Sequence, residues 1–268
     1  MTLNSGTAIW LDSQTSPEQV ALVSGGGAGH EPAFAAYVGK GMLTAAVSGN
    51  IFASPSVSQI VSTISRVARP AGVLLIIMNY TGDIFHFHLA AEKAKAATGC
   101  PVEVLVVGDD VSVGRAKSGK VGRRGLAGTV LVEKILGAYN QRPGLTLDNL
   151  LELGKAVSAN LVTVGTSLGH VHIPGRPQTG PGEVVCELGM GIHNEPGCRV
   201  LDPQPSLSNL IEMMLDQLLD MTDADRAYVD FSDASDVVLL VNNLGGTSSI
   251  EFGGITTNVL KALGETCV

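Results

Sequence analysis

Residues 20–32, with the sequence VALVSGGGAGHEP, decide the fold that we expect for this chain. The first four are aliphatic and predict a buried strand, and the glycine cluster after them predicts a loop at the carboxyl end of that strand. Glycine allows positive φ and lets backbone N–H groups approach a ligand closely, so such a loop can hold a small, oxygen-rich molecule. A tight connection between a strand and a helix, without any ligand, is the alternative interpretation.

A dinucleotide-binding loop fits these residues less well. The pattern G-x-G-x-x-G, started at Gly25, would need a further glycine where His30 stands. Residues 45–50, about twenty positions on, contain no acidic side chain that would bind a ribose. The histidine instead adds a titratable group at the edge of the expected loop.

The composition indicates a globular α/β protein. The chain has 268 residues, of which 45% are hydrophobic and only 4% aromatic, and it contains 33 glycines. This balance is typical of chains in which tight loops connect short aliphatic elements. The net charge of −8 argues against a nucleic-acid partner, because binding a phosphate backbone needs a basic surface. The longest apolar run, Val73–Met78, is too short to span a membrane, so we expect no membrane partner.

The cysteines point to a reducing compartment. All four are widely spaced and form no C-x-x-C pair, and no secretory signal follows Met1. We therefore expect a cytoplasmic protein.

Apolar runs alternate with helical patterns, which predicts a parallel or mixed sheet. We expect strands at residues 20–23, 72–78, 102–107, 161–168, 183–188 and 237–241. We expect helices at residues 32–38, 54–64, 84–98, 127–138, 147–158, 207–219 and 248–263, the second of them capped by Ser54. The Pro- and Gly-rich residues 174–181 indicate a boundary. The expected fold class is α/β, with one α/β subdomain at residues 1–180 and a second at residues 181–268.

Three of these strands end in stretches of similar chemistry: SGGGAGHEP at 24–32, NYTGD at 79–83 and GMGIHNEPG at 189–197. Ligand sites in α/β sheets lie at the carboxyl ends of strands. His30, Asp83 and His193 are therefore candidates for acid, base and nucleophile of one pocket. Each also has a structural interpretation, because Asp83 can cap the helix that follows and a single histidine is often a surface or core residue.

Two further motifs suggest phosphate or metal binding. Residues 114–121, GRAKSGKV, nearly match a Walker A loop, but Val121 stands where a magnesium-binding hydroxyl is needed and no strong strand precedes the loop. The pairs His86/His88 and His170/His172 suggest zinc, yet they lack i, i+4 spacing and a nearby cysteine pair. We predict neither a P-loop nor a bound metal.

Eight motifs, in their order and spacing, resemble the substrate-binding K domain of the dihydroxyacetone kinase family, most of all that of the single-chain fungal enzymes. They cover nearly the whole chain and are SGGGAGHEP, GKGM (39–42), FASP (52–55), NYTGD, VGDDVSV (107–113), GRRGLAGTVL (122–131), GMGIHNEPG and VNNLGG (241–246). The resemblance implies a two-part α/β domain, usually dimeric, that binds dihydroxyacetone, with glyceraldehyde as a second candidate substrate.

The resemblance also implies roles for particular residues. His193 matches the histidine whose ring nitrogen adds to the substrate carbonyl as a hemiaminal, a chemistry that excludes glycerol because glycerol has no carbonyl. His30 matches the acid/base histidine, and Asp83 matches the aspartate that takes the proton from the hydroxyl attacking phosphorus. The substrate-binding residues implied in this way are Gly26, Gly27, Gly29, His30, Met78, Asp83 and His193.

The sequence departs from the family pattern in its residues and in its extent. Some relatives have lysine where Met78 stands, serine at the position of Ala28 and histidine at that of Phe34. We expect the change at Met78 to affect the affinity for the substrate and not the class of protein. The family also has an extra helix before this segment, further strands after it, and a separate helical L domain that binds ATP and magnesium. We therefore expect a shortened chain, with an incomplete second subdomain, that depends on an L domain not present in it.

The resemblance leaves three interpretations open. The first is the substrate-binding domain of a kinase that forms dihydroxyacetone phosphate. The second is a non-catalytic module that binds dihydroxyacetone and regulates another process. The third is an inactive fragment that does not fold stably, because missing strands would expose sheet edges.

Overall fold

The computed structural model describes residues 2–4, 7–11, 16–119, 121–173, 175, 186–234 and 236–266. The chain forms two compact units, one made of residues 1–109 and 124–161 and the other of residues 110–123 and 162–268. The boundary that we predicted between residues 180 and 181 lies outside the described residues.

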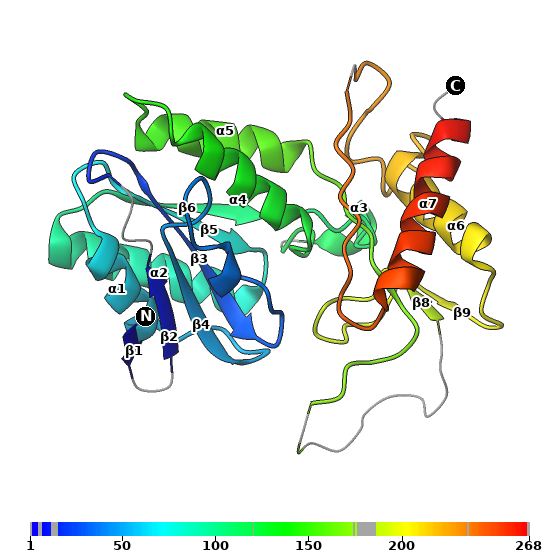
Figure 1. Cartoon of the computed structure of the whole chain (residues 1–268), viewed down its shortest axis with the longest axis horizontal. Coiled ribbons are helices and arrows are strands. Elements are labelled where there is room, and N and C mark those ends of the chain that lie inside the picture. The colour runs from blue at the N-terminus through cyan, green and yellow to red at the C-terminus, as the bar shows by residue number, and fades with distance from the viewer. Residues whose placement is uncertain are drawn as a thin grey trace. The chain divides into compact units, whose positions relative to one another are not determined.

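The first unit contains a six-stranded mixed sheet with the strand order β1-β2-β4-β3-β5-β6 (Figure 1). Its strands are β1 (Thr2–Asn4), β2 (Thr7–Leu11), β3 (Ala21–Ala28), β4 (Ala45–Ile51), β5 (Val73–Met78) and β6 (Val102–Val107). Strands β4, β3, β5 and β6 run parallel to one another, whereas β2 is antiparallel to both of its neighbours, β1 and β4. The predicted α/β class is confirmed.

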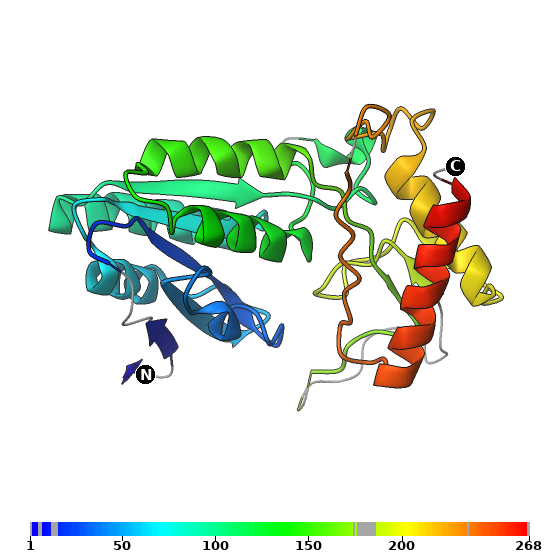
Figure 2. The same ribbon diagram turned by 45° about the horizontal axis from the view of Figure 1, so that its top comes forward.

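Helices cover both faces of this sheet (Figure 1). They are η1 (Ala35–Tyr37), α1 (Val57–Val67), α2 (Thr81–Thr98), α4 (Gly128–Tyr139) and α5 (Leu147–Ala159). Helices α1 and α2 pack on one face, and η1, α4 and α5 belong to the core on the other, where α4 and α5 lie side by side (Figure 2).

Strand β5 shows why the two faces form. Successive side chains of a strand point to opposite faces, so Val73, Leu75 and Ile77 pack with α1 and α2, while Leu74 and Ile76 pack with α4 and α5. All five are fully buried, and each such side chain contributes roughly 1.5–3 kcal/mol to folding. A strand buried on both faces has a continuous apolar sequence rather than an alternating one.

The helix boundaries differ in part from the predicted ones. Helix α1 is capped by Ser56, whose hydroxyl accepts from the backbone N–H of Gln59 in a capping box, so the cap predicted at Ser54 is wrong. Helix α2 begins at Thr81, which places Asp83 inside its first turn and excludes the interpretation of Asp83 as a cap. The predicted end at Gly99 is confirmed, since Gly99 has a φ of 68°.

A buried carboxyl group lies in the layer formed by α4. Glu133 is fully buried, and neither of its carboxyl oxygens has a well-formed hydrogen bond among the described residues. Burial raises the pKa of Glu133 to about 8, which the nearby Ser24 hydroxyl offsets only in part. Glu133 is therefore protonated at neutral pH.

The second unit contains a small antiparallel sheet with the order β7-β8-β9. Its elements are α3 (Arg115–Ser118), β7 (Thr166–Ser167), β8 (Cys186–Leu188), β9 (Arg199–Leu201), α6 (Leu207–Leu219) and α7 (Ser249–Thr266). The strand predicted at 161–168 is shorter than expected, because only Thr166 and Ser167 pair with β8, and Thr163 forms an isolated bridge with Asp110. Helix α6 has the predicted bounds and packs against α7.

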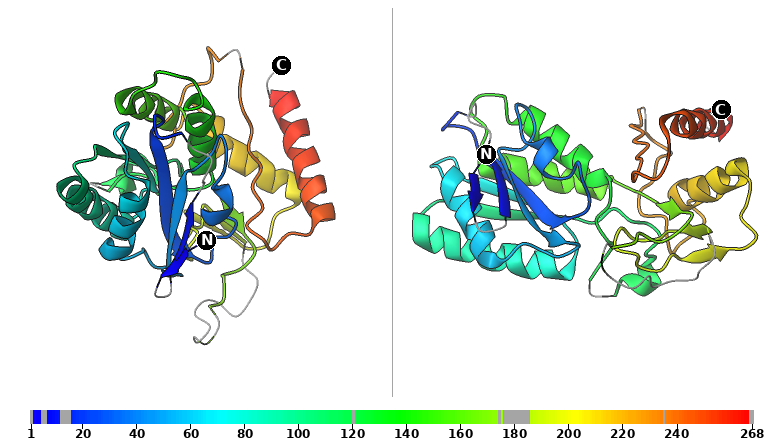
Figure 3. Two further views of the ribbon diagram at one scale, coloured as in Figure 1. Left: turned by 60° about the vertical axis from the view of Figure 1, so that its left-hand side comes forward. Right: turned by 60° about the horizontal axis from the view of Figure 1, so that its bottom comes forward.

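The strand predicted at residues 237–241 is wrong. Residues 236–244 run as an extended segment into α7 without pairing to any described strand (Figure 3). Val237, Val238, Leu239 and Leu240 are 40–77% exposed. Their β-branched and aliphatic sequence favours a strand, but a strand needs a neighbouring backbone to accept its hydrogen bonds.

Candidate functional site

The order of the strands marks one edge of the first sheet as a place for a ligand. From β3 the chain goes to β4 on one side and then crosses back to β5 on the other. Ligands of open α/β sheets bind beyond the carboxyl ends of the strands at such a switch point. Met78 is the last residue of β5, His30 follows β3 by two residues, and Asp83 follows β5 by five. The structure therefore brings these three residues to the same edge.

The glycine cluster is part of a strand and not the loop that we predicted. Strand β3 extends to Ala28 and pairs with β4 through Gly25 and Gly26, with an irregularity before Ala28. A Cβ atom at Gly25 would meet the carbonyl oxygen of Val47, and one at Gly27 would lie 2.7 Å from the backbone nitrogen of Ala53. These glycines allow β3 and the β4 region to approach more closely than other residues permit.

His30 lies at the end of this glycine strand against an aromatic ring. Gly29 has a φ of 97°, so the chain turns directly after β3. The imidazole of His30 is half-buried and stacks on Phe52, with ring centroids 4.9 Å apart and an angle of 23° between the planes. No local sequence pattern predicts this contact.

Asp83 is placed by the first turn of α2. Its side chain is 7% exposed and lies where the partial positive charge of the helix N-terminus is concentrated. Met78 lies beside Gly125, where a Cβ atom would be 2.6 Å from the Cβ atom of Met78. The side chain of Met78 thus starts directly against the backbone of Gly125.

His193 belongs to the second unit, in the turn between β8 and β9. Its ring Nδ1 lies 3.0 Å from Oε1 of Glu195, and its backbone N–H donates to Oε2 of the same carboxylate at 2.9 Å. Burial opposes ionisation of Glu195, but these hydrogen bonds outweigh it and lower the pKa of Glu195 to about 2. A carboxylate at Nδ1 assigns the hydrogen to that nitrogen, and the lone pair of the ring then lies on Nε2.

The turn that carries His193 is held by its neighbours. Asn194 has a φ of 63°, and its side-chain amide makes two hydrogen bonds with the backbone of Val171, at 2.8 and 2.9 Å. Next to it, Nε2 of His170 lies 2.9 Å from Oε1 of Glu187, whose Oε2 accepts from the backbone N–H of Gly197 at 2.9 Å. The Gly197 hydrogen bond is the main reason why the pKa of Glu187 is lowered.

The remaining histidine and phosphate motifs have structural partners. His86 Nδ1 lies 2.8 Å from the carbonyl oxygen of Pro55. Within the Walker-like stretch, α3 has only four residues, and the backbone N–H of Ala116 donates to Asp225 at 2.7 Å. The described residues contain no group of three or more His, Cys, Asp or Glu side chains that could hold a metal ion.

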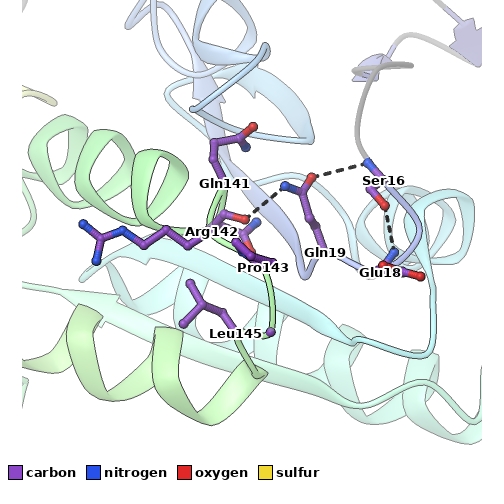
Figure 4. A pocket seen from close by; sticks show the side chains of 9 residues that line it. Ser16, Glu18, Gln19, Gln141, Arg142, Pro143 and Leu145 are labelled. Atoms are coloured by element: carbon purple, nitrogen blue, oxygen red, sulfur yellow. Dashed lines mark hydrogen bonds between the residues drawn. The ribbon is translucent and has the colours of Figure 1, made fainter.

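A pocket of about 200 Å³ lies at the other end of β3 (Figure 4). It is lined by Ser16, Glu18, Gln19 and residues 140–145. The side-chain amide of Gln19 donates to the carbonyl oxygen of Asn140 at 3.1 Å, and that of Asn140 donates to Val20 at 2.8 Å. The pocket therefore lies at the amino end of the strand, away from His30 and Asp83. No helix among the described residues is long and apolar enough to cross a membrane.

Comparison with known proteins identifies the family. The Dak1 domain matches residues 1–268. The chain belongs to the Dak1 domain family. It is 53% identical over 262 residues to dihydroxyacetone kinase 1 of Saccharomyces cerevisiae, covering 95% of this chain and 44% of the yeast protein. The match to the Dak1 domain thus confirms the family resemblance that the sequence motifs indicated.

Solved structures agree with this assignment. The crystal structure of the dihydroxyacetone kinase of C. freundii matches with a TM-score of 0.86 and 39% identity, covering 97% of this chain and 46% of that one. The dihydroxyacetone kinase operon co-activator Dha-DhaQ matches with a TM-score of 0.84 and 33% identity, covering 97% of this chain and 78% of that one. The chain spans less than half the length of the kinases that it matches.

Proposed function

We propose that this chain binds dihydroxyacetone covalently on His193 and presents it for phosphorylation to dihydroxyacetone phosphate. The observation that carries the proposal is the pairing of His193 with Glu195. Because Glu195 lies at Nδ1, the nitrogen with the lone pair is Nε2, which makes the ring a nucleophile. Membership of the Dak1 family, whose relatives include dihydroxyacetone kinases, supports the choice of substrate.

The proposed addition conserves all atoms of the substrate. Nε2 of His193 attacks the carbonyl carbon, the N–C bond forms, and the electron pair of the C=O double bond moves to oxygen, which takes a proton from His30 acting as an acid. The ring of His193 becomes positively charged, and the ionised Glu195 next to Nδ1 compensates this charge. The attacking nitrogen has no hydrogen left to lose, so the adduct cannot dehydrate to a neutral imine. Glycerol, which has no carbonyl, cannot form it.

The other predicted residues complete the proposed site. Asp83, in the first turn of α2, accepts the proton of the substrate hydroxyl that attacks phosphorus. Gly26, Gly27, Gly29 and Met78 contact the substrate at the carboxyl ends of β3 and β5. Glyceraldehyde also has a carbonyl group and is a second candidate substrate.

ATP with magnesium is the proposed phosphoryl donor, bound by a separate L domain as partner. The dihydroxyacetone kinase of C. freundii has been solved in complex with AMP-PNP and Mg²⁺, and it has the fold of this chain at 38% identity. The described residues of this chain offer no cluster for magnesium, so we derive no step through the metal. We further propose a cytoplasmic homodimer, as the family resemblance implies.

A regulatory binding module is the second candidate function. Its support is the match to the operon co-activator Dha-DhaQ, of which the chain covers 78%. Such a module would form the same adduct without transferring phosphate.

Native mass spectrometry of the chain with dihydroxyacetone tests the proposal. We expect a mass increase equal to one dihydroxyacetone, because no water is lost, and its absence in His193→Ala. His170→Ala is the matched control, since His170 also pairs with a glutamate but is not proposed to react. No adduct on the folded parent chain would refute the site. Adding an L domain with Mg-ATP then separates kinase from regulator, because only the kinase forms triose phosphate.

A further inference from the structure

The segment Phe52–Pro55, the FASP motif of the sequence, has no role in the function proposed above. Phe52 has a φ of 53°, in the left-handed region that residues other than glycine, asparagine and aspartate rarely adopt. Such outliers in a protein are often found where a site needs an exact arrangement. The contacts of the segment show what it arranges.

One set of contacts joins the segment to the glycine strand. The backbone N–H of Phe52 donates to the carbonyl oxygen of Ala28 at 2.9 Å. A Cβ atom at Gly27 would lie 2.7 Å from the backbone nitrogen of Ala53, and one at Gly29 would lie 2.8 Å from the Phe52 ring. The ring of Phe52 thus lies over the bare backbone of Gly29 and reaches the imidazole of His30.

A second set of contacts joins the same segment to α2. A Cβ atom at Gly82 would lie 2.7 Å from the hydroxyl oxygen of Ser54. The carbonyl oxygen of Pro55 lies 2.8 Å from Nδ1 of His86, one turn further along α2. Asp83 lies between these two contact points, in the first turn of the helix. Four consecutive residues therefore touch the elements that carry both His30 and Asp83.

We propose that Phe52 is a positioning residue for His30 and that the FASP segment sets His30 and the first turn of α2 in one arrangement. This inference rests on the proposed function, in which His30 acts as the acid. His30 follows a turn and is only half-buried, and the face of Phe52 lies against its ring. This contact limits rotation of the imidazole, and a proton donor held in one orientation reacts faster than one that rotates.

Three substitutions at position 52 separate the ring from the backbone. Phe52→Tyr keeps an aromatic face, Phe52→Leu keeps an apolar side chain, and Phe52→Asn removes the ring but tolerates positive φ. NMR of the chain measures the chemical shifts of the His30 ring protons, assigned by their loss in His30→Asn. Native mass spectrometry measures the rate of adduct formation on His193.

We expect the Phe52 ring to shift the His30 ring protons upfield in the parent chain and in Phe52→Tyr. We expect this shift to be lost in Phe52→Asn and Phe52→Leu, and the adduct to form about 10- to 100-fold more slowly in both. A normal rate in Phe52→Asn, or a parent without the upfield shift, would overturn the inference. A parent that forms no adduct at all would refute the proposed function, while the shifts would still decide whether Phe52 fixes the ring.

Discussion

Replacing Glu133 by glutamine tests whether burial under α4 keeps this carboxyl group protonated in the folded protein. Glutamine has the shape of the protonated acid and cannot ionise. In the folded protein, burial raises the pKa of Glu133 to about 8 from an ordinary value of 4.5. The unfolded chain thus releases the proton near pH 4.5, whereas the folded chain keeps it until about pH 8.

The sign of the effect follows from this difference. Between these two pH values the folded state binds one proton more than the unfolded state, so the free energy of unfolding falls by about 1.4 kcal/mol per pH unit as the pH rises. At pH 7 the accumulated loss is about 3 kcal/mol, and above pH 8 it stays constant. Glu133→Gln should remove this loss, and the variant should be more stable than the parent by about that amount at pH 7 and by less than about 1 kcal/mol at pH 5.

Urea unfolding at pH 5, 6, 7 and 8 measures the difference. Far-UV circular dichroism follows the loss of α4 and the other helices during unfolding. Glu152→Gln, on an exposed position of the neighbouring α5, is the matched control and should not change the pH dependence. A stability difference that is the same at every pH, or a less stable Glu133→Gln at pH 7, would refute the reasoning.

Three other changes test local features. Glu195→Gln removes the carboxylate beside His193 and should slow adduct formation about 10- to 100-fold in native mass spectrometry; an unchanged rate would mean that the carboxylate is not needed. Gly25→Ala should lower the free energy of unfolding by about 1–3 kcal/mol, because its Cβ atom meets β4, whereas Gly39→Ala, with nothing within 4 Å, should not share this loss. Ser56→Ala removes the cap of α1 and should cost about 1 kcal/mol in the same urea assay, a value that a stability equal to the parent's would contradict.

The elements predicted correctly are those with strong local patterns. The continuous apolar sequence of β5, the glycine after α2 and the amphipathic pattern of α6 each decide the structure within a few residues. The glycine strand was missed because glycine has low strand propensity. Its extension depends on close packing against Val47 and Ala53, which are distant in sequence. The strand predicted at residues 237–241 was wrong for the opposite reason. The propensity of these residues favours a strand, but no described strand pairs with them.

The candidate site was predictable to a similar extent. His30, Asp83 and His193 were chosen as candidates because they follow predicted strands, whose carboxyl ends are recognisable from sequence. Glu195 could have been found in the same way, as an acidic residue two positions from a histidine in a glycine-rich turn. The role of Phe52 could not, since neither its positive φ nor its stacking on His30 follows from a local pattern.

The exposed residues 237–240 bear on how the protein behaves at high concentration. They form an unbroken apolar stretch of high strand propensity, in extended conformation, without a charge or a proline between them. The backbone of such a stretch is a template on which a second molecule can add a strand, and repeated addition leads to aggregates. A single lysine in place of Val238, the most exposed of the four, would place a charge in the stretch and oppose such addition.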